Sequence, residues 1–315
     1  MSEPTPAYPS RLDARARGTG HGTPVVILNP ACNQGRAGRL RKPLGRALGG
    51  GRGELVLTAA VHDAEHLARE AALAGRDIVA VGGDGTIAEV GNGILASGAC
   101  VALGIVPAGT GNDYAYETLR LPREPLRALE LALAGRPVAM DAGQVNERYF
   151  LNALGVGIDA NIAAAAESLK RIPFLRGQTL YWAASLRELL FHYDQCPLLT
   201  IAWDDAPAEN KLYALAAVSI GPTYGGGFQI NPGADPRDGY FELCMLTKPP
   251  LARALRLLPM VEKGKHLNQP EAHHVRVQRV TMAAEQEINA HLDGEVIRAQ
   301  RFTVRILPGA LLVRQ

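Results

Sequence analysis

The chain lacks the patterns that mark secreted, zinc-binding and membrane-spanning proteins. Its four cysteines are scattered over 315 residues and form no CxxC pair. This spacing argues against a disulfide framework or a zinc site, and it favours a reducing cytoplasm as the location. No uninterrupted apolar run reaches the ~20 residues that a membrane-spanning helix needs. Residues 1–23 are rich in Pro, Gly and Arg and contain no apolar signal-peptide core, so we expect a flexible leader.

A large charge imbalance is also absent. The formal net charge of +2 gives no reason to expect nucleic acid as a partner, and it is compatible with brief contact with an anionic membrane. A composition of 47% hydrophobic and 20% charged residues suits a globular protein with a substantial core. The length of 315 residues favours two domains.

The first half of the chain alternates apolar strands with amphipathic helices. Strands are expected over 24–30, 54–60, 77–83 and 101–109, and helices over 38–49, 62–75, 86–98 and 123–135. Because each strand is nearly all apolar, the pattern predicts an open parallel sheet covered on both faces, in an α/β domain over 24–140.

The second half reads as strands joined mostly by turns. Its helical stretches are limited to 159–171, 178–191 and 249–264. We therefore expect an antiparallel β-sandwich domain with helical insertions over 141–305.

Three glycine-rich segments follow strands of the first half: NPACNQGRAG from residue 29, GGDGT from residue 82 and PAGTGND from residue 107. Ligands of open parallel sheets lie beyond the carboxyl ends of the strands. Glycine lets backbone N–H groups approach a phosphate, and a helix N-terminus adds a favourable dipole. Thr86 and Thr110 add hydroxyl donors. Glycines also form ordinary turns, but three such turns at one edge favour a phosphate site.

Neither standard nucleotide motif explains these turns. The chain has no GxxxxGK[ST] segment, which excludes a P-loop NTPase. GxGxxA occurs at 91–96, inside an expected helix, and at 155–160, where no acid follows about twenty residues later to bind a ribose. A Rossmann-type dehydrogenase is therefore a weak alternative.

Asp84 stands inside the second glycine turn, where a carboxylate would repel a phosphate. Mg²⁺ between the two would remove the repulsion, because Mg²⁺ accepts carboxylate ligands and neutralises phosphate oxygens during phosphoryl transfer. The alternative role of Asp84 is the N-cap of a helix that begins at Thr86, and one residue could fill both roles.

The ordered set of motifs resembles the catalytic domain of the diacylglycerol kinase and sphingosine kinase family, especially its soluble bacterial lipid kinases. The matches are ILNPACNQGRAG, VGGDGTIAEV, GIVPAGTGNDYA, NALGVGIDA, GGGFQINPGADPRDGYFEL, HLDGE and VRILPGALLV. They run in order from residue 24 to the end of the chain. GGDGT alone is less specific, because NAD kinases also carry it.

The resemblance implies an ATP- and Mg²⁺-dependent kinase with an ATP-binding α/β domain and a lipid-binding sandwich, in which residues 306–315 return to the first domain. The expected nucleotide contacts are Asn29, Pro30, Ala31, Cys32, Asn33, Thr58, Gly82, Gly83, Asp84, Gly85, Thr86, Ile87, Ala88 and Thr110.

The resemblance also implies a metal loop and a general base. ADPRDGYFE would hold a structural Mg²⁺ on Asp238 with Asp235 and Tyr240, partly through backbone oxygens. LDGE would supply the catalytic base, for which Glu295 is the first choice and Asp293 the second. Asp84 is the third expected catalytic residue. On residue pattern alone, LDGE is a hairpin turn with exposed acids.

One departure from the family pattern affects the first turn. Family members usually carry a Ser-Gly pair where this chain has Cys32 and Asn33, so a serine hydroxyl contact would be lost. NAD kinase is the main alternative function, but its NxGxLGFL-type segment is missing.

The expected partner is a diacylglycerol-like lipid, met transiently at a membrane surface from the cytoplasm. Residues 171–193 mix aromatics, leucines and arginines as an interfacial helix would, although most such helices pack on their own domain. Nucleic acid is not expected, and a homodimer is left open.

Overall fold

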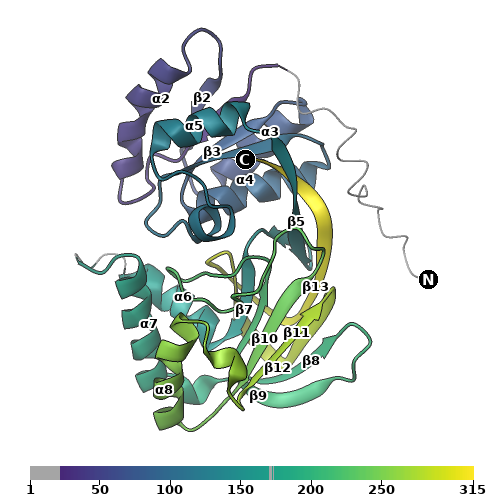
Figure 1. Cartoon of the computed structure of the whole chain (residues 1–315). Helices are drawn as coiled ribbons and strands as arrows, with labels where there is room; N and C mark the ends of the chain where they lie inside the picture. Colours follow the sequence, from purple (N-terminus) through teal and green to yellow (C-terminus); the bar gives the residue numbers. More distant parts are fainter. Residues whose placement is uncertain (1–21, 170–171, 173) are drawn as a thin grey trace.

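The computed structural model describes residues 22–169, 172 and 174–315, and one sheet runs through both halves of the molecule (Figure 1). The leader expected over 1–23 falls almost entirely outside these ranges. The first half contains β1 (Val25–Leu28), η1 (Arg36–Leu40), α2 (Arg41–Ala47), β2 (Glu54–Leu57), α3 (Asp63–Leu73), β3 (Ile78–Gly82), α4 (Asp84–Ser97), β4 (Ala102–Pro107), η2 (Tyr114–Thr118) and α5 (Pro125–Ala134).

The parallel sheet predicted for the first half is confirmed. Its strands lie in the order β2-β1-β3-β4, and each neighbouring pair is parallel. Successive side chains of a strand point to opposite faces. Ile27 accordingly packs in the cluster that includes residues of α3 and α4, while Val26 and Leu28 pack with residues of α2 and α5. Both faces are covered, which explains why the strands are apolar throughout.

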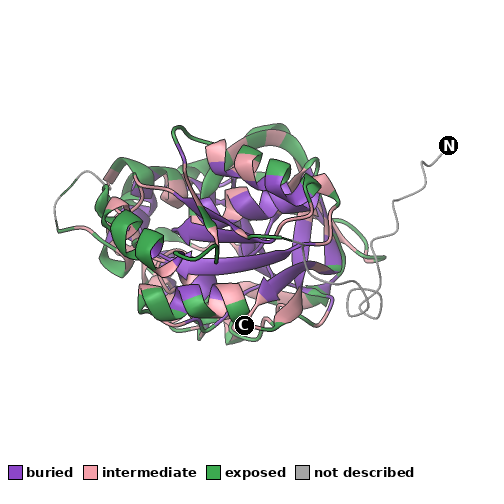
Figure 2. Cartoon of the chain, turned by 90° about the horizontal axis from the view of Figure 1, so that it is seen from above, coloured by how far each residue is buried: buried purple, intermediate pink, exposed green. Residues whose placement is uncertain are grey.

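The second half is mainly antiparallel, as predicted. It contains β5 (Pro137–Val145), β6 (Arg148–Phe150), β7 (Ala153–Gly157), α6 (Ile158–Leu169), α7 (Gln178–Phe191), η3 (Tyr193–Gln195), β8 (Leu198–Trp203), β9 (Glu209–Ser219), β10 (Phe241–Thr247), α8 (Leu251–Glu262), η4 (His266–Asn268), β11 (Ala272–Val277), β12 (Arg279–Leu292) and β13 (Glu295–Arg314). Helices α6, α7 and α8 lie together along one side of these strands (Figure 1). Seen from above, the strands form the buried interior and the helices carry the exposed surface (Figure 2).

Strand β13 joins the two halves. It begins beside β12 in the antiparallel part, continues along β5, and ends with Leu312 and Val313 paired in parallel with Ala102 and Leu103 of β4. The sequence suggested that residues 306–315 return to the first domain. In the structure the return is made by the far end of a single 20-residue strand, so the two sheets are continuous.

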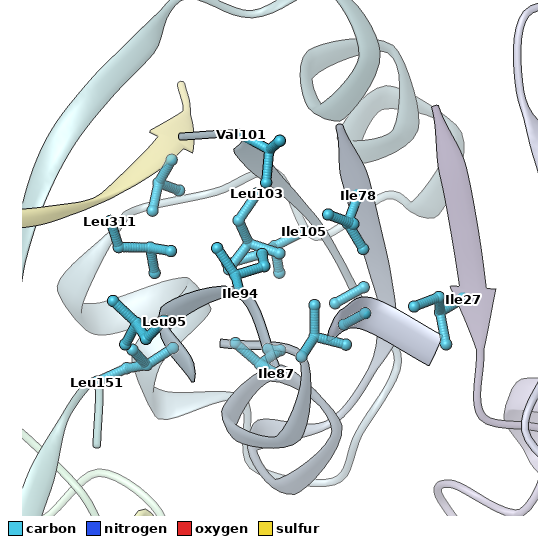
Figure 3. Close-up of a cluster of buried hydrophobic side chains, with 14 of the residues drawn as sticks. Ile27, Ile78, Ile87, Ile94, Leu95, Val101, Leu103, Ile105, Leu151 and Leu311 are labelled. Carbon is cyan, nitrogen blue, oxygen red and sulfur yellow. The ribbon is translucent and has the colours of Figure 1, made fainter. Parts of the chain in front are cut away.

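The two halves also share a hydrophobic core. Leu151, from the β6–β7 connection, and Leu311, from β13, lie among the isoleucines of the first half (Figure 3). The packing is close, because a Cβ added to Gly91 of α4 would lie 2.7 Å from Leu151 Cδ1. This shared core fixes how the second half sits against the carboxyl edge of the parallel sheet. No helix in the described ranges is long and apolar enough to cross a bilayer.

Candidate active site

Side-chain hydrogen bonds hold the three glycine-rich turns together at the carboxyl edge of the parallel sheet. Asn29, which follows β1, donates from Nδ2 to Thr86 Oγ1 at 3.1 Å, and this bond joins the first turn to the second. Thr110 Oγ1 donates to Asn33 Oδ1 at 3.5 Å and joins the third turn to the first. Thr58 lies at the same edge, where its N–H donates to the carbonyl of Leu28.

The second and third turns touch through glycine. A Cβ added to Gly83 would lie 3.1 Å from Gly109 Cα and 3.3 Å from Cys32 Sγ, so a side chain there would push the turns apart. Cys32 occupies the position where family members usually carry serine, and its thiol donates to the carbonyl of Ala108 at 3.7 Å. The sulfur therefore faces the third turn.

Asp84 is tied to the third turn by its carboxylate. Oδ2 accepts the N–H of Asn112 at 2.7 Å, and Oδ1 accepts the N–H of Tyr114 at 3.2 Å. The N-cap role considered for Asp84 is wrong, because α4 begins at Asp84 itself and Gly83 is the N-cap residue. Burial raises the pKa of Asp84, while the two backbone hydrogen bonds act in the opposite direction.

The remaining predicted nucleotide contacts lie around these turns. Ala31 donates its N–H to Asn29 Oδ1 at 3.1 Å, which shapes the first turn. Gly85 is exposed at the N-terminus of α4, whereas Ile87 and Ala88 line a cavity on the other side of the helix. Pro30 lies in the first turn, two residues after β1. Gly82 is the last residue of β3 and begins the second turn.

The cavity extends from the turns into the second half of the molecule. Asp84, Asp113 and Asp293 line its polar end. Its far end lies among residues of α7, α8, β10 and the connections beside them: Leu189, Tyr193, Phe228, Leu246, Leu257 and Leu258. One continuous space therefore has carboxylates at the edge that carries the glycine-rich turns and apolar side chains toward α7 and α8.

The carboxylates at the polar end influence one another. Burial raises the pKa of Asp113 to about 6, and the nearby charge of Asp84 adds to the shift. Asp293 behaves in the same way, with burial raising its pKa to about 6 against three backbone hydrogen bonds that lower it. Grouped, desolvated acids of this kind are stabilised by a cation.

The two acids of LDGE lie in different surroundings. Asp293 accepts the N–H groups of Leu151, Asn152 and Ala153 at 2.7–3.0 Å, so both of its oxygens are engaged. Glu295 lies outside the cavity lining, and its Oε2 is 2.9 Å from Nη2 of Arg148. Arg148 also lies 3.9 Å from Glu65 in the first turn of α3. Glu295 thus faces the first half of the molecule, and its catalytic role stays a prediction.

Sequence reasoning missed several polar groups of the site. Asp113 stands in the third glycine turn and accepts the N–H of Gly226 at 2.7 Å, so its presence in PAGTGND could have marked it. Asp159 lies deeper in the cavity, where Oδ2 accepts the hydroxyl of Tyr224 at 2.6 Å and lies 2.9 Å from His291 Nε2. No sequence signal links Arg148 to Glu295.

The predicted structural Mg²⁺ loop does not fit a metal ion. Asp238 Oδ2 is bonded to Arg276 at 2.5 Å, and Asp235 Oδ1 lies 3.4 Å from Nε of Arg237. Within the described ranges, no three His, Cys, Asp or Glu side chains are grouped as metal ligands would be. Tyr240 lies in the same loop and stacks with Arg276.

We predict that Asp113→Asn stabilises the ligand-free protein at pH 8 and not at pH 4. The folded pKa of about 6 is above the ordinary value of about 3.9, so folding favours the protonated carboxyl. The stability that the protonated Asp113 carboxyl contributes is fully present below pH ~3.9 and is lost as the pH rises through ~6. Asparagine does not ionise, so the variant keeps its stability over the same range. Thermal unfolding across this range should show the Tm gap between variant and wild type opening with pH. A constant gap, or one that closes as pH rises, would contradict the origin assigned to the shift.

Comparisons with known proteins agree with this arrangement. Residues 23–145 match the diacylglycerol kinase catalytic domain family, and residues 152–315 match the YegS C-terminal NAD kinase beta sandwich-like domain family. Among curated relatives, a diacylglycerol kinase of Bacillus subtilis (strain 168) is 33% identical over 244 residues, which cover 76% of this chain and 77% of the relative. A probable lipid kinase YegS-like of Chromohalobacter salexigens is 34% identical over 258 residues, 79% of each chain.

Solved structures show the same fold. A crystal structure of a diacylglycerol kinase from Bacillus anthracis str. Sterne superimposes with a TM-score of 0.68 at 22% identity, over 93% of this chain and 96% of that chain. At this identity the likeness concerns the fold, while the family matches and the curated relatives concern the activity. The family matches and the curated relatives show that the chain belongs to the diacylglycerol kinase and YegS-like lipid kinase family and that it is a lipid kinase.

Proposed function

We propose that the protein transfers the γ-phosphoryl group of ATP to a hydroxyl of a diacylglycerol-like lipid in an Mg²⁺-dependent reaction. The observation that carries this proposal is the position of Asp84. It opens helix α4 at the phosphate-binding edge, and it also lines the cavity that continues into apolar side chains. A phosphate donor and a lipid acceptor can therefore meet at one place.

The nucleotide side of the site is supported by the donors that the turns present. The N–H groups of Asp84, Gly85 and Thr86 precede the first bond of α4, in which Ile87 donates to the carbonyl of Gly83 at 3.0 Å, and such groups at a helix N-terminus suit a phosphate. Asn29 and Thr110 hold the neighbouring turns in place through their hydrogen bonds. We assign the triphosphate to this edge.

Asp84 and Asp113 are the residues that would hold Mg²⁺, in part through water. Both are carboxylates whose pKa is raised mainly by burial, so a divalent cation would relieve a cost that the ligand-free site carries. When bound, Mg²⁺ neutralises charge on the phosphate oxygens. Two carboxylates suffice, because Mg²⁺ keeps several waters and takes further oxygens from the phosphates.

The apolar end of the cavity is the proposed site of the acyl chains. Leu189, Leu257 and Leu258 line it together with aromatic side chains, and transfer of hydrocarbon from water to such surroundings is favourable. The polar end would then hold the acceptor hydroxyl near the γ-phosphate. This arrangement shields the reacting oxygen from water, which limits hydrolysis of ATP.

NAD kinase is not favoured. The second-half family is described as NAD kinase beta sandwich-like, so the sandwich does not separate the two activities. The first-half match is to the diacylglycerol kinase catalytic domain, and the apolar end of the cavity offers a dinucleotide few polar partners.

The direct test uses the full chain with γ-labelled ATP, Mg²⁺ and a panel of lipids in mixed micelles, with NAD as a separate acceptor. We expect label in at least one diacylglycerol-like lipid and none in NAD. Asp84→Asn is the matched control, because it removes the charge but keeps an oxygen acceptor for the turn. It should abolish labelling in a protein that stays folded, with a lower Tm because the amide nitrogen would face one of the two backbone N–H groups that Asp84 now accepts. Labelling of NAD and of no lipid would contradict the proposal.

We assign the general base to Glu295. It is 42% exposed at its side chain and is held by one ion pair, so it can change partner when substrates bind. Asp293 has both oxygens occupied by backbone N–H groups and is better suited to fixing the LDGE turn. A base must come within hydrogen-bond reach of the acceptor hydroxyl, and contacts of this kind often tighten only in the substrate complex.

Glu295→Gln should lower kcat by about 10²–10⁴-fold, the usual contribution of a general base, with an unchanged Tm. Asp293→Asn should lower both activity and Tm, because an amide nitrogen would face backbone N–H groups. Glu65→Gln, which removes the other acid beside Arg148, is the control and should stay active. A folded but inactive Asp293→Asn beside a fully active Glu295→Gln would move the base to Asp293.

We further propose that helix α7 meets an anionic membrane surface from the cytoplasmic side. Its inner face lines the cavity with Tyr181 and Leu189, while its outer side exposes Leu190 and Phe191, the latter 74% exposed. Arg187, three and four residues before these two in the helix, is also exposed and would face lipid phosphates. The expected interfacial segment 171–193 also includes Arg171 and Pro173, which lie outside the described residues.

Membrane contact is tested by co-sedimentation with phosphatidylglycerol-containing vesicles. Replacing Leu190 and Phe191 together by serine should reduce the bound fraction several-fold. Leu73→Ser, which removes an equally exposed leucine from α3 in the first half, should leave binding unchanged. Equal binding by wild type and the double variant would exclude α7 as the docking surface.

A further inference from the structure

The positively charged side chain of Arg276 lies against loop 234–240. Arg276 of β11 reaches the loop and lies 2.5 Å from Asp238 Oδ2 through Nη2. Its Nε lies 3.5 Å from Glu242 Oε1, and its guanidinium carbon lies 4.6 Å from the centre of the Tyr240 ring. Two carboxylates and one aromatic face thus surround a single guanidinium.

Both carboxylate oxygens of Asp238 and one of Asp235 already have partners. The second oxygen of Asp238 accepts the N–H of Tyr240 at 3.0 Å. Oδ1 of Asp235 accepts the N–H of Arg237 at 3.1 Å and faces the Arg237 side chain. Mg²⁺ requires near-octahedral oxygen ligands at about 2.0–2.1 Å, whereas Asp238 is already paired with the positive charge of Arg276.

Three backbone oxygens of the loop are engaged as well. The carbonyl of Pro236 accepts the N–H of Asp141 at 2.8 Å, and the carbonyl of Gly239 accepts Gln278 Nε2 at 3.2 Å. The carbonyl of Asp235 accepts the N–H of Asp238 at 3.4 Å. These bonds hold the loop against β5 and the connection before β12.

The charges around the loop explain why a cation is needed there. The side chain of Glu242 is only 7% exposed and that of Asp238 26%, whereas that of Arg276 is 53% exposed. A carboxylate withdrawn from water is costly unless a positive charge accompanies it. Arg276 lies over both acids from the solvent side and supplies that charge.

We propose that Arg276 takes the place of a structural divalent cation at loop 234–240, so that this part of the fold binds no metal. The proposal concerns the second half of the chain alone and does not depend on the kinase assignment. Taken together with the proposed function, it predicts that Mg²⁺ binds only at the carboxylates of the cavity.

The first test measures bound metal and thermal unfolding of the nucleotide-free full chain. After desalting, we expect far less than one Mg²⁺ or Ca²⁺ per chain by plasma mass spectrometry. The Tm in EDTA should equal the Tm in millimolar Mg²⁺. If Mg²⁺ raises the Tm, the same measurement on Asp238→Asn locates the site. Loss of the rise in that variant would overturn the proposal, and its persistence would place the ion elsewhere.

The second test removes the cation. Arg276→Gln should lower the Tm in EDTA by about 2–6 °C, because it removes the guanidinium from two partly buried acids, of which only Glu242 keeps another basic group, His274, at 2.8 Å. Arg276→Lys keeps the charge without the planar fork and should lose less. Arg279→Gln, which removes an exposed pair with Asp205, is the control and should change little. An Arg276→Gln protein as stable as the control, or a divalent ion retained by the wild type and lost in Asp238→Asn, would refute the inference.

Discussion

The pairing of β13 with both halves of the sheet is the constraint on which the site depends. The strand begins at Glu295, directly after the turn that carries Asp293, and it ends beside β4, which leads into the PAGTGND turn. Two buried acids hold its far part in place. Asp141 accepts the N–H of Gly309, and Asp77 pairs with Arg314 at 2.5 Å. Because a paired strand cannot slide without breaking its ladder, the LDGE turn is held in a fixed relation to the phosphate-binding edge.

Because the LDGE turn is held at this edge, acidic residues from distant parts of the chain lie close together. Asp84, Asp113 and Asp293 come from three different segments, yet the charge of Asp84 raises the pKa of both other acids. Such a group is costly in the free protein and is relieved by a metal ion and by the N–H donors of the turns. The loop around Asp238 differs, because Arg276 already supplies a positive charge to its acids. The same residue type therefore marks a ligand site in one place and a closed structural contact in the other.

Much of the fold and part of the site follow from sequence patterns alone. Apolar runs identify the four parallel strands, and glycine clusters at their ends identify the phosphate-binding edge. The hydrogen-bond partners of Asp84 could not be predicted in this way. Its carboxylate accepts the N–H groups of Asn112 and Tyr114, which lie 28 and 30 positions later in the sequence. Arg148 and Glu295 are 147 positions apart, and Arg276 and Asp238 are 38 apart. Local pattern also cannot show that β13 continues from one sheet into the other, since that depends on which strands it pairs with.

The central claim is that the phosphate-binding edge and the apolar cavity form one site for two substrates. A crystal structure with a non-hydrolysable ATP analogue, Mg²⁺ and a diacylglycerol tests it most directly. The account predicts the γ-phosphate at the carboxyl edge beside Asp84, and the lipid hydroxyl at the polar end of the cavity. The acyl chains should lie among the side chains of α7 and α8. A nucleotide base inside the cavity, or a lipid bound elsewhere on the protein, would contradict the account.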